Sequence, residues 1–484
     1  MDKDLFVKKI KFPQEKFFLE VFLLLISDLL MLVISFLISV LVRFALIPIL
    51  SGEIIADLSI DLFLLLIFTN IILFSFKGNY PGRGYVAVTE LKNLIEGIFT
   101  AFFLVGLVIF ITTPISNYSR SIFLISLFLS CVLVPIGRFT TRKIMSLTEW
   151  WGEPIAIVGS GDEILSLYED VKKCRRLGFR PVVGLFIDEL KIEKNHKVTI
   201  PFFPLNHDIL NHLKTRNVKT LIISLPPNEF RKKNPELLNE IEKLFIRAIF
   251  LLDNVSFGFL WGHSVDIEGR PAFQMQHNLL NPLTNFLKRV VDFILAILFL
   301  IPSFFIILVA SFLIKIDSPG KIFYTQERIG KDKKNFRIFK FRTMEKNADE
   351  ILDKIFEENP NLRNEYEKYH KLENDPRITR VGKLLRRLSL DEIPQIFNVF
   401  RGEMSLIGPR AYMASEMKDI SSDAEIIFRV KPGLTGWWQV MGRNDTTFTQ
   451  RKKMDIYYIN NWSLWMDLYI FLKTFWVLLS SKGL

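Results

Sequence analysis

Two adjacent carboxylates, Asp391 and Glu392, lie between a basic run at residues 383–387 and a segment that ends at Arg410. An ionised aspartate can attack phosphorus as a nucleophile, and the oxygens of a neighbouring glutamate suit Mg²⁺. Cations on both sides could balance the charge of phosphate groups. Because an apolar segment broken by a proline also precedes this region, the pattern predicts phosphoryl chemistry at a membrane surface.

Two local structures could hold these carboxylates. Ser389 and Glu392 have the spacing of a capping box at a helix start, whereas Pro394 would be equally suitable as the first residue of a helix. In either case the carboxylates lie at the positive end of a helix. We expect that field and the nearby arginines to keep Asp391 ionised.

Further cations fall at spacings that would bring them together. Residues 322–330 and 336–344 have the pattern of two paired strands. Period-two geometry puts Lys340 and Arg342 on one face of the second strand, where they could grip a pyrophosphate, although a solvated basic edge strand has the same pattern. Cations also recur every third residue in a stretch that would form a basic stripe on a helix, suited to phosphates or lipid headgroups. They are Arg377, Arg380, Lys383 and Arg386.

The composition is that of a membrane protein. The chain has 484 residues, of which 50% are hydrophobic, more than one soluble core needs. Its formal net charge of +11 could suggest nucleic acid, but the basic residues lie beside apolar runs, so anionic lipid or phosphate ligands explain the charge better. The two cysteines, Cys131 and Cys174, can provide neither a disulfide framework nor a cysteine zinc site.

Four long apolar stretches at residues 17–42, 62–76, 98–113 and 122–136 approach the roughly 20 residues that a helix needs to cross hydrocarbon. Lysine and arginine are concentrated before the first stretch, between the second and third, and after the fourth, which predicts that both ends of this module are cytoplasmic. Asp28 within the first stretch is either a functional intramembrane acid or a structural one.

The next segment is typical of an α/β domain. The run Ile155–Val158 predicts a buried strand that enters the glycine turn 159–161 before a helical pattern at 163–176. This order resembles a dinucleotide-binding fold, but Ile164 stands where close helix packing normally requires the third glycine. A structural or regulatory Rossmann-like domain is therefore favoured over real nucleotide binding.

Residues 290–314 are long enough to span a membrane, yet cations mark both ends of this stretch as cytoplasmic. Pro302 near its centre removes a backbone hydrogen bond and should bend the helix. We therefore expect a re-entrant helix that enters and leaves on one face, with a kinked fifth span as the alternative. The closing stretch 464–479 contains Asp467 and Lys473, so it is expected to lie at the interface, and a spanning helix is the alternative.

Four ordered motifs, at residues 340–344, 389–395, 404–410 and 431–437, resemble those of the bacterial polyprenyl-phosphate hexose-1-phosphate transferases, the monotopic phosphoglycosyl transferases. Residues 278–282, 438–447 and 457–465 are similar to the undecaprenyl-phosphate galactose phosphotransferase branch. The long form of the family implies a multi-domain membrane protein. Its expected parts are a four-helix transmembrane module (1–147), a Rossmann-like α/β cytoplasmic domain (148–275), a re-entrant membrane helix (276–316) and an α+β cytoplasmic catalytic domain with interfacial helices (317–484).

The resemblance implies a two-step reaction at the bacterial inner membrane. Asp391 would attack the sugar-bound phosphorus of a UDP-hexose, UMP would leave, and undecaprenyl phosphate would take the hexose-1-phosphate from the enzyme. Glu392 would hold Mg²⁺ and also take part in catalysis. The resemblance implies charge balance for the phosphates by Lys340, Arg342, Arg386 and Arg410, and contacts to nucleotide, sugar or metal by Gln439, Arg443 and Asp455.

The chain departs from the family pattern at two prolines. Ile301 stands before Pro302 where relatives usually place serine, and Ala411 follows Arg410 where a second proline is usual. Galactose is the expected sugar and glucose the alternative, and long-form relatives imply a homo-oligomer, a dimer. A catalytically inactive nucleotide-sensing membrane scaffold and a transporter built on the N-terminal helices remain alternatives from other classes. We expect no nucleic-acid partner.

Overall fold

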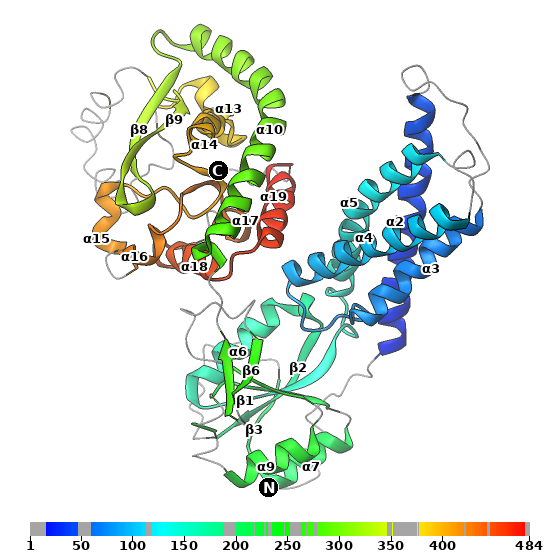
Figure 1. Ribbon diagram of the computed structural model, residues 1–484. Helices are drawn as coiled ribbons and strands as arrows, with labels where there is room; N and C mark the ends of the chain where they lie inside the picture. The colour runs from blue at the N-terminus through cyan, green and yellow to red at the C-terminus, as the bar shows by residue number, and fades with distance from the viewer. Residues whose placement is uncertain are drawn as a thin grey trace. The chain divides into compact units, whose positions relative to one another are not determined.

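The computed structural model describes residues 16–46, 60–112, 119–187, 200–216, 218–226, 229–230, 235–245, 247–251, 263–267, 270–274, 278–345, 351, 375, 377–420, 423–442 and 446–479. The chain forms two compact units, Met1–Asp253 and Asn254–Leu484. Figure 1 shows the elements of both units.

The first unit begins with four helices, α2 (Phe17–Ala45), α3 (Ile60–Phe76), α4 (Ala87–Thr112) and α5 (Arg120–Met145). Among the described residues of this unit, α2, α4 and α5 are long and apolar enough to cross a membrane, whereas α3 is a shorter apolar helix. Leu32, Phe74, Ile98 and Val134 bring one residue from each helix into a shared buried cluster. Each predicted apolar stretch overlaps one helix, but α4 begins eleven residues before its predicted stretch and α5 ends nine residues after its own, and the count of four spans stays a prediction.

Buried ion pairs join these helices at the end that leads into the α/β domain. Asp28 pairs with Arg138 and accepts a 2.7 Å hydrogen bond from the Tyr80 hydroxyl. Nearby, Glu20 pairs with Arg83 at 2.7 Å and accepts a hydrogen bond from the backbone of the α/β domain. Since Asp28 is fully buried among partners, the geometry favours its structural interpretation over a free intramembrane acid.

A five-stranded parallel sheet follows, with the order β3-β2-β1-β4-β5. Its elements in chain order are β1 (Glu153–Gly159), α6 (Gly161–Lys173), η2 (Arg175–Leu177), β2 (Phe179–Phe186), β3 (Phe202–Pro204), α7 (His207–Thr215), β4 (Thr220–Ile223), α9 (Pro235–Leu244) and β5 (Arg247–Phe250). This is the Rossmann-like order, and it agrees with the prediction from the strand–turn–helix pattern.

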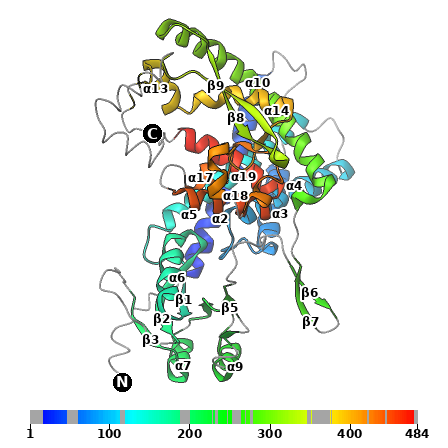
Figure 2. The same ribbon diagram turned by 90° about the vertical axis from the view of Figure 1, so that its left-hand side faces the viewer.

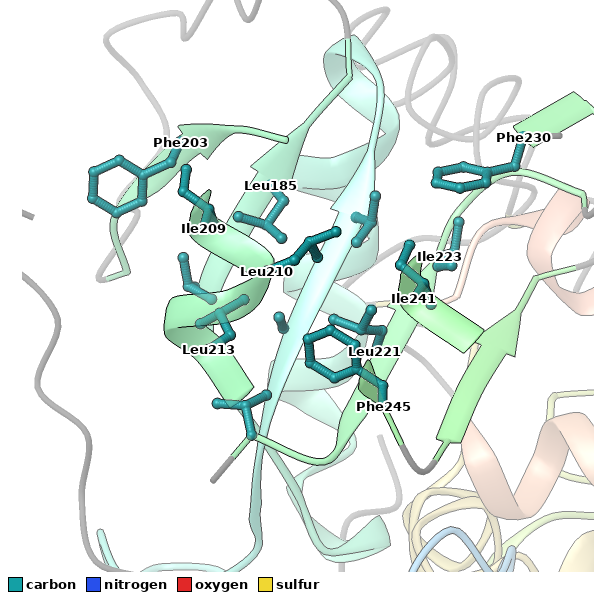
Figure 3. Packing of buried hydrophobic residues seen from close by; sticks show 14 of the residues in the cluster. Leu185, Phe203, Ile209, Leu210, Leu213, Leu221, Ile223, Phe230, Ile241 and Phe245 are labelled. Carbon is teal, nitrogen blue, oxygen red and sulfur yellow. The ribbon is translucent and has the colours of Figure 1, made fainter. Parts of the chain in front are cut away.

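Both faces of the sheet are covered, which explains why its strands are apolar without alternation. Ala156 and Val158 of β1 face the cluster that α7 and α9 complete, whereas Ile155 and Ile157 face α6. Figure 3 shows Leu210 of α7 and residues of β4 pointing toward one another in the first of these clusters. Both faces of the sheet are therefore buried.

The second unit holds the motifs of interest. Its described elements are β6 (His263–Ile267), β7 (Arg270–Gln274), η3 (Asn278–Leu280), α10 (Pro282–Asp317), β8 (Phe323–Ile329), η4 (Lys331–Lys333), β9 (Asn335–Phe341), α13 (Arg380–Arg387), η5 (Leu390–Gln395), α14 (Ile396–Arg401), β10 (Ser405–Ile407), η6 (Ala414–Glu416), α15 (Met417–Ile420), α16 (Ala424–Ile427), β11 (Gly433–Thr435), α17 (Trp437–Met441), α18 (Phe448–Asn460) and α19 (Leu464–Leu479). Figure 2 shows the β8–β9 hairpin and α14 beside α10.

Helix α10 is bent by 51° between Pro282–Ile301 and Ser303–Asp317, at the place where Pro302 predicts a bend. Its first half packs through Ala296 against a cluster that includes Val399 of α14. Its second half packs through Ala310 and Ile314 against Phe341 of β9 and Leu385 of α13. Both halves therefore contact the same α+β domain, while many other side chains of α10 are exposed apolar groups.

Candidate active site

The β8–β9 hairpin carries Lys340 of the candidate site. The strands pair antiparallel as the sequence predicts, with Tyr324 opposite Lys340 and Arg328 opposite Phe336. Opposed residues of an antiparallel pair share one face of the sheet. Ile338, between Lys340 and Phe336 on this face, packs against Ile396 of α14. The face of β9 that carries Lys340 is therefore turned toward the segment with the two carboxylates.

The buried Asn398 joins that segment to the hairpin by two hydrogen bonds. The Asn398 Oδ1 atom accepts from the backbone N–H of Phe339 at 3.1 Å, and its Nδ2 donates to the Arg337 carbonyl at 2.8 Å. The side chain thus pairs with β9 as a neighbouring strand would. Sequence reasoning missed this residue, although a lone polar side chain in the apolar run 396–400 is a usable signal.

Asp391 and Glu392 lie in a tight turn between two helices. Thr379 caps α13 by accepting from the Gly382 N–H at 2.9 Å, and α13 ends before Ser389, which adopts the left-handed backbone conformation with φ 54°. The 3₁₀ helix η5 then leads into α14 at Ile396. Within the described chain the Ser389 side chain makes no capping hydrogen bond, so the predicted capping box is not formed.

Lys340 and Glu392 form an ion pair, with 2.7 Å between Nζ and Oε1. Both side chains are partly exposed, so water screens this pair and it contributes little to folding stability. Its importance is positional, because it holds a cation and a carboxylate next to Asp391. The structure thus brings together the four residues that the resemblance implies for catalysis, because Arg386 also interacts electrostatically with Asp391.

Burial and the charge of Glu392 raise the pKa of Asp391 to about 6, while Lys340 and Arg386 act in the opposite direction. The sequence predicts the opposite direction, because it shows the cations but not the burial. An aspartate with this pKa is still mostly ionised at neutral pH, and it is a stronger base than an exposed aspartate. Both properties suit a nucleophile.

Arg386 and Arg342 have different surroundings. The Arg386 Nε donates to the Thr343 hydroxyl at 2.9 Å, and burial lowers the pKa of Arg386 while the charge of Asp391 raises it. Arg342 instead donates to the Ser318 carbonyl at 2.7 Å and to the Pro319 carbonyl at 3.0 Å, at the end of α10. Arg386 therefore acts on Asp391, whereas Arg342 ties the end of β9 to the residues that follow α10.

Among the other predicted residues, Asp455 of α18 contacts Arg410. Its Oδ2 accepts from the backbone N–H of Arg410 at 3.1 Å and from the Tyr412 hydroxyl at 2.7 Å. Burial raises the pKa of Asp455 to about 7, against the lowering effect of Tyr412 and Arg410. Gln439 donates to the Leu434 carbonyl at 3.4 Å. Arg443, the remaining predicted residue, lies outside the described residues.

Two glycines allow the strand before Arg410 to approach its neighbour. β10 and β11 pair in parallel, and a Cβ on Gly408 would lie 2.7 Å from the Gly433 nitrogen. A Cβ on Gly433 would overlap the Gly408 nitrogen. Side chains at either position would force the two backbones apart. The glycines of the motifs 404–410 and 431–437 therefore have a packing reason.

The polar residues of the apolar helices form a buried network that the sequence does not reveal. Lys288 of α10 donates to Asp467 of α19 at 2.7 Å and to the Ile407 carbonyl at 3.0 Å. Asp467 also accepts from the Tyr458 hydroxyl at 2.7 Å. Asp292 accepts from the Ser405 hydroxyl, directly before the strand residues that lead to Arg410. Asp467, interpreted from sequence as facing the interface, is therefore buried in the domain.

The site offers few ligands of its own to a metal ion. Among the described residues, no cluster of three or more histidine, cysteine or acidic side chains could hold one. Asp391 and Glu392 alone provide carboxylate oxygens in this turn. Mg²⁺ is commonly held by one or two carboxylates together with substrate phosphates, so this donor set fits Mg²⁺ when a phosphate substrate is bound.

Comparisons with known proteins place these features in a family. Residues 283–481 match the bacterial sugar transferase family, and residues 75–251 match the family described as CoA-binding domain. An uncharacterized sugar transferase of Haemophilus influenzae is 33% identical over 81% of this chain and 83% of its own length. Undecaprenyl-phosphate galactose phosphotransferase of Salmonella typhimurium is 32% identical over 76% of each chain.

UDP-glucose:undecaprenyl-phosphate glucose-1-phosphate transferase of Xanthomonas campestris is 28% identical over 83% of this chain and 82% of its own length. The residues that match the sugar transferase family include the β8–β9 hairpin, the turn with Asp391 and Glu392, and the strand before Arg410. Because two relatives above 30% identity are also matched over three quarters or more of their length, the chain belongs to the bacterial sugar transferase family.

Proposed function

We propose that this protein transfers a hexose-1-phosphate from a UDP-hexose to undecaprenyl phosphate and releases UMP. The observation that carries the proposal is the half-buried Asp391 carboxylate beside the Lys340–Glu392 ion pair, in a chain similar to transferases named for this lipid. The reaction would be the first membrane step in the synthesis of an O-antigen, a capsule or an exopolysaccharide. Galactose is favoured, since the galactose phosphotransferase is the more similar of these two relatives.

The chemistry proceeds in two displacements at one phosphorus atom. An Asp391 oxygen forms a bond to the sugar-bearing phosphorus, and the bond from that phosphorus to the oxygen of UMP breaks, so UMP leaves with the electron pair. An oxygen of undecaprenyl phosphate then attacks the same phosphorus and releases the Asp391 carboxylate. Arg386 and Lys340 stabilise the negative charge on the phosphoryl oxygens, which is the main demand of phosphoryl transfer.

Glu392, whose Oε1 atom pairs with Lys340, would hold Mg²⁺ together with the phosphates of the donor. The ion would supply charge neutralisation at the two phosphates of the donor. Lys340 then keeps Glu392 oriented toward the phosphates. It also keeps its own charge near the sugar-bearing phosphate. Arg410 would balance charge at the nucleotide side, where its guanidinium lies near Glu416 at 3.4 Å.

The packing of α10 supports a proposed membrane placement. Both halves of the bent helix contact one α+β domain, which supports entry and exit on the same face of the membrane. The catalytic unit would therefore lie at the cytoplasmic face of the bacterial inner membrane, where a soluble UDP-hexose and a lipid-borne phosphate can meet. We retain the expectation of a homodimer as part of this proposal.

The decisive experiment measures UMP release from a panel of UDP-sugars by membranes that contain undecaprenyl phosphate. We expect UDP-galactose to give the fastest release and to yield a lipid-linked diphosphate sugar. A donor labelled at the sugar-bearing phosphorus should leave label on Asp391 when the lipid is withheld. Faster release from UDP-glucose would reassign the sugar. Lipid-linked product formed normally by an Asp391→Ala variant would refute the covalent mechanism and favour an inactive scaffold role for this chain.

A further inference from the structure

The 3₁₀ helix η2, which follows α6, is fixed against the last turns of the apolar helix α5. The Arg176 guanidinium lies 3.8 Å from the centre of the Phe139 ring. The Trp151 indole donates to the Arg175 carbonyl at 2.8 Å, and the Arg175 guanidinium donates to the Thr148 carbonyl at 3.0 Å. These contacts join the α/β domain to the end of a helix that is long and apolar enough to cross a membrane.

The position of Phe139 in α5 sets the depth of this contact. Phe139 is the twentieth residue of α5, counted from Arg120, and roughly 20 residues cross the hydrocarbon core of a bilayer. In a membrane that α5 crosses from its first turn, the remaining residues 140–145 extend about 9 Å beyond the hydrocarbon. The headgroup layer on each side is about 5 to 8 Å thick. The Arg176 side chain therefore lies at the level of the lipid headgroups.

Further basic side chains lie around this contact. They are Lys143, one turn after Phe139 on α5, Lys172 and Lys173 at the end of α6, and Arg175 and Arg176 of η2, and they are called the η2 basic patch below. Lys143, Lys172 and Lys173 are exposed, and among the described residues none of the five forms an ion pair with a carboxylate. Asp170 is the one acid in residues 170–176, against four cations. The patch therefore presents a net positive charge at the headgroup level.

Exposed apolar side chains lie beside these charges. Ile144 in the last turn of α5 is 66% exposed, and Leu147, two residues beyond the helix, is 79% exposed. Basic groups next to exposed apolar ones are typical of surfaces that lie in the interfacial layer of a membrane. The favourable position of cations at a helix C-terminus explains Lys172 and Lys173. It explains neither Arg176, which lies beyond α6, nor the exposed Leu147.

We propose that the η2 basic patch binds the headgroup phosphates of anionic phospholipids and thereby holds the α/β domain against the membrane surface. The cations are spread over the ends of two helices and are partly or fully exposed, which suits several separate headgroups better than one enclosed soluble ligand. Each basic residue near an anionic leaflet raises the affinity about fivefold. The proposal gives a role to a domain whose family is described as CoA-binding. It rests on α5 crossing the membrane and not on the proposed transfer reaction.

The test is hydrogen exchange of the full-length protein in nanodiscs, measured by mass spectrometry over residues 170–177. One set of nanodiscs holds phosphatidylcholine alone, and the other holds a mixture of phosphatidylcholine and anionic phosphatidylglycerol. Exchange in this segment should slow severalfold in the mixed nanodiscs, because bound headgroups oppose the local opening that exposes the amides. The double variant Lys172→Gln, Lys173→Gln should lose most of this slowing, since two basic residues at about fivefold each contribute about 25-fold to the lipid affinity.

The matched control is Lys214→Gln, Lys243→Gln, which removes the same charge from exposed side chains of α7 and α9 and should keep the slowing, because these helices cover the face of the sheet opposite to α6. Coenzyme A and inorganic phosphate should not slow exchange in phosphatidylcholine nanodiscs.

Three outcomes would overturn the proposal. One is equal exchange of the wild-type segment in the two sets of nanodiscs, and another is an equal loss of slowing in the two double variants. The third is slowing by coenzyme A or inorganic phosphate as strong as that by phosphatidylglycerol, which would make the patch a site for soluble anions. None of these measurements needs UMP release, so failure of the proposed transfer reaction leaves the test of the patch intact.

Discussion

Replacing Lys340 by methionine separates two effects of this cation. The Lys340 charge lowers the pKa of Asp391, which burial and Glu392 hold at about 6. The variant should therefore have a higher Asp391 pKa, by about one unit for the loss of a nearby, partly screened opposite charge. Asp391 must be ionised to attack phosphorus, so activity falls as the pH drops through this pKa. The acid limb of the pH profile should move to higher pH.

The magnitude follows from the ionised fraction of Asp391. With a shift of about one unit, the fraction falls about twofold at pH 7 and about tenfold at pH 5. The assay is the burst of UMP from a UDP-sugar without lipid acceptor, which reports the first displacement alone. An additional fall of the burst rate beyond these factors is a separate effect. If that additional fall is the same at every pH, it measures the contact between Lys340 and the phosphates.

Two control variants test whether the shift of the acid limb comes from the Lys340 charge. Lys340→Arg keeps the charge and should keep the acid limb in place, even if the rate changes. Lys333→Met removes a lysine at the far turn of the same hairpin, where it pairs with the exposed Glu425, and should alter neither rate nor profile. An acid limb that stays in place or moves to lower pH in Lys340→Met would contradict the electrostatic coupling inferred here.

Three further outcomes follow from the packing. Asn398→Ala removes both hydrogen bonds to β9 and should destabilise the protein by about 2 to 4 kcal/mol, measured by thermal unfolding in detergent. Gly433→Ala should abolish activity and folding, whereas Gly106→Ala, where a Cβ finds 3.6 Å to its nearest neighbour, should be tolerated. Because burial raises the pKa of Asp455 to about 7, the stability that its protonated form provides is complete below about pH 4 and is lost as the pH rises through 7. Asp455→Asn should flatten that dependence in unfolding measurements from pH 4 to 8.

Local pattern predicts much of this fold. The strand–turn–helix order at 155–176 and the paired runs before and after residue 330 reappear as β1, α6 and the β8–β9 hairpin. Helix α19 has the bounds that its apolar pattern predicts. These elements depend on side-chain periodicity and turn residues, which are visible within a window of about 20 residues.

The charges at the site could not be predicted in the same way. The pKa of Asp391 depends on how deeply the turn is buried, which tertiary packing decides. Arg342 shares a strand face with Lys340 by periodicity, but its partners are the carbonyls of Ser318 and Pro319 at the end of another element. Asp467 looks like a surface residue of an interfacial helix, yet Lys288 of α10, 179 residues away, pairs with it inside the domain.

Helix α10 contacts two parts of the candidate site. By its sequence it is an apolar anchor, but its first half binds the strand before Arg410 through Lys288 and Asp292. Its second half packs against Phe341 and Leu385, in β9 and in the helix before the Asp391 turn. One bent helix therefore contacts both the strand before Arg410 and the elements beside the Asp391 turn. Under the proposed placement of α10 in the membrane, a change in its depth should move both parts of the site together relative to the proposed lipid phosphate.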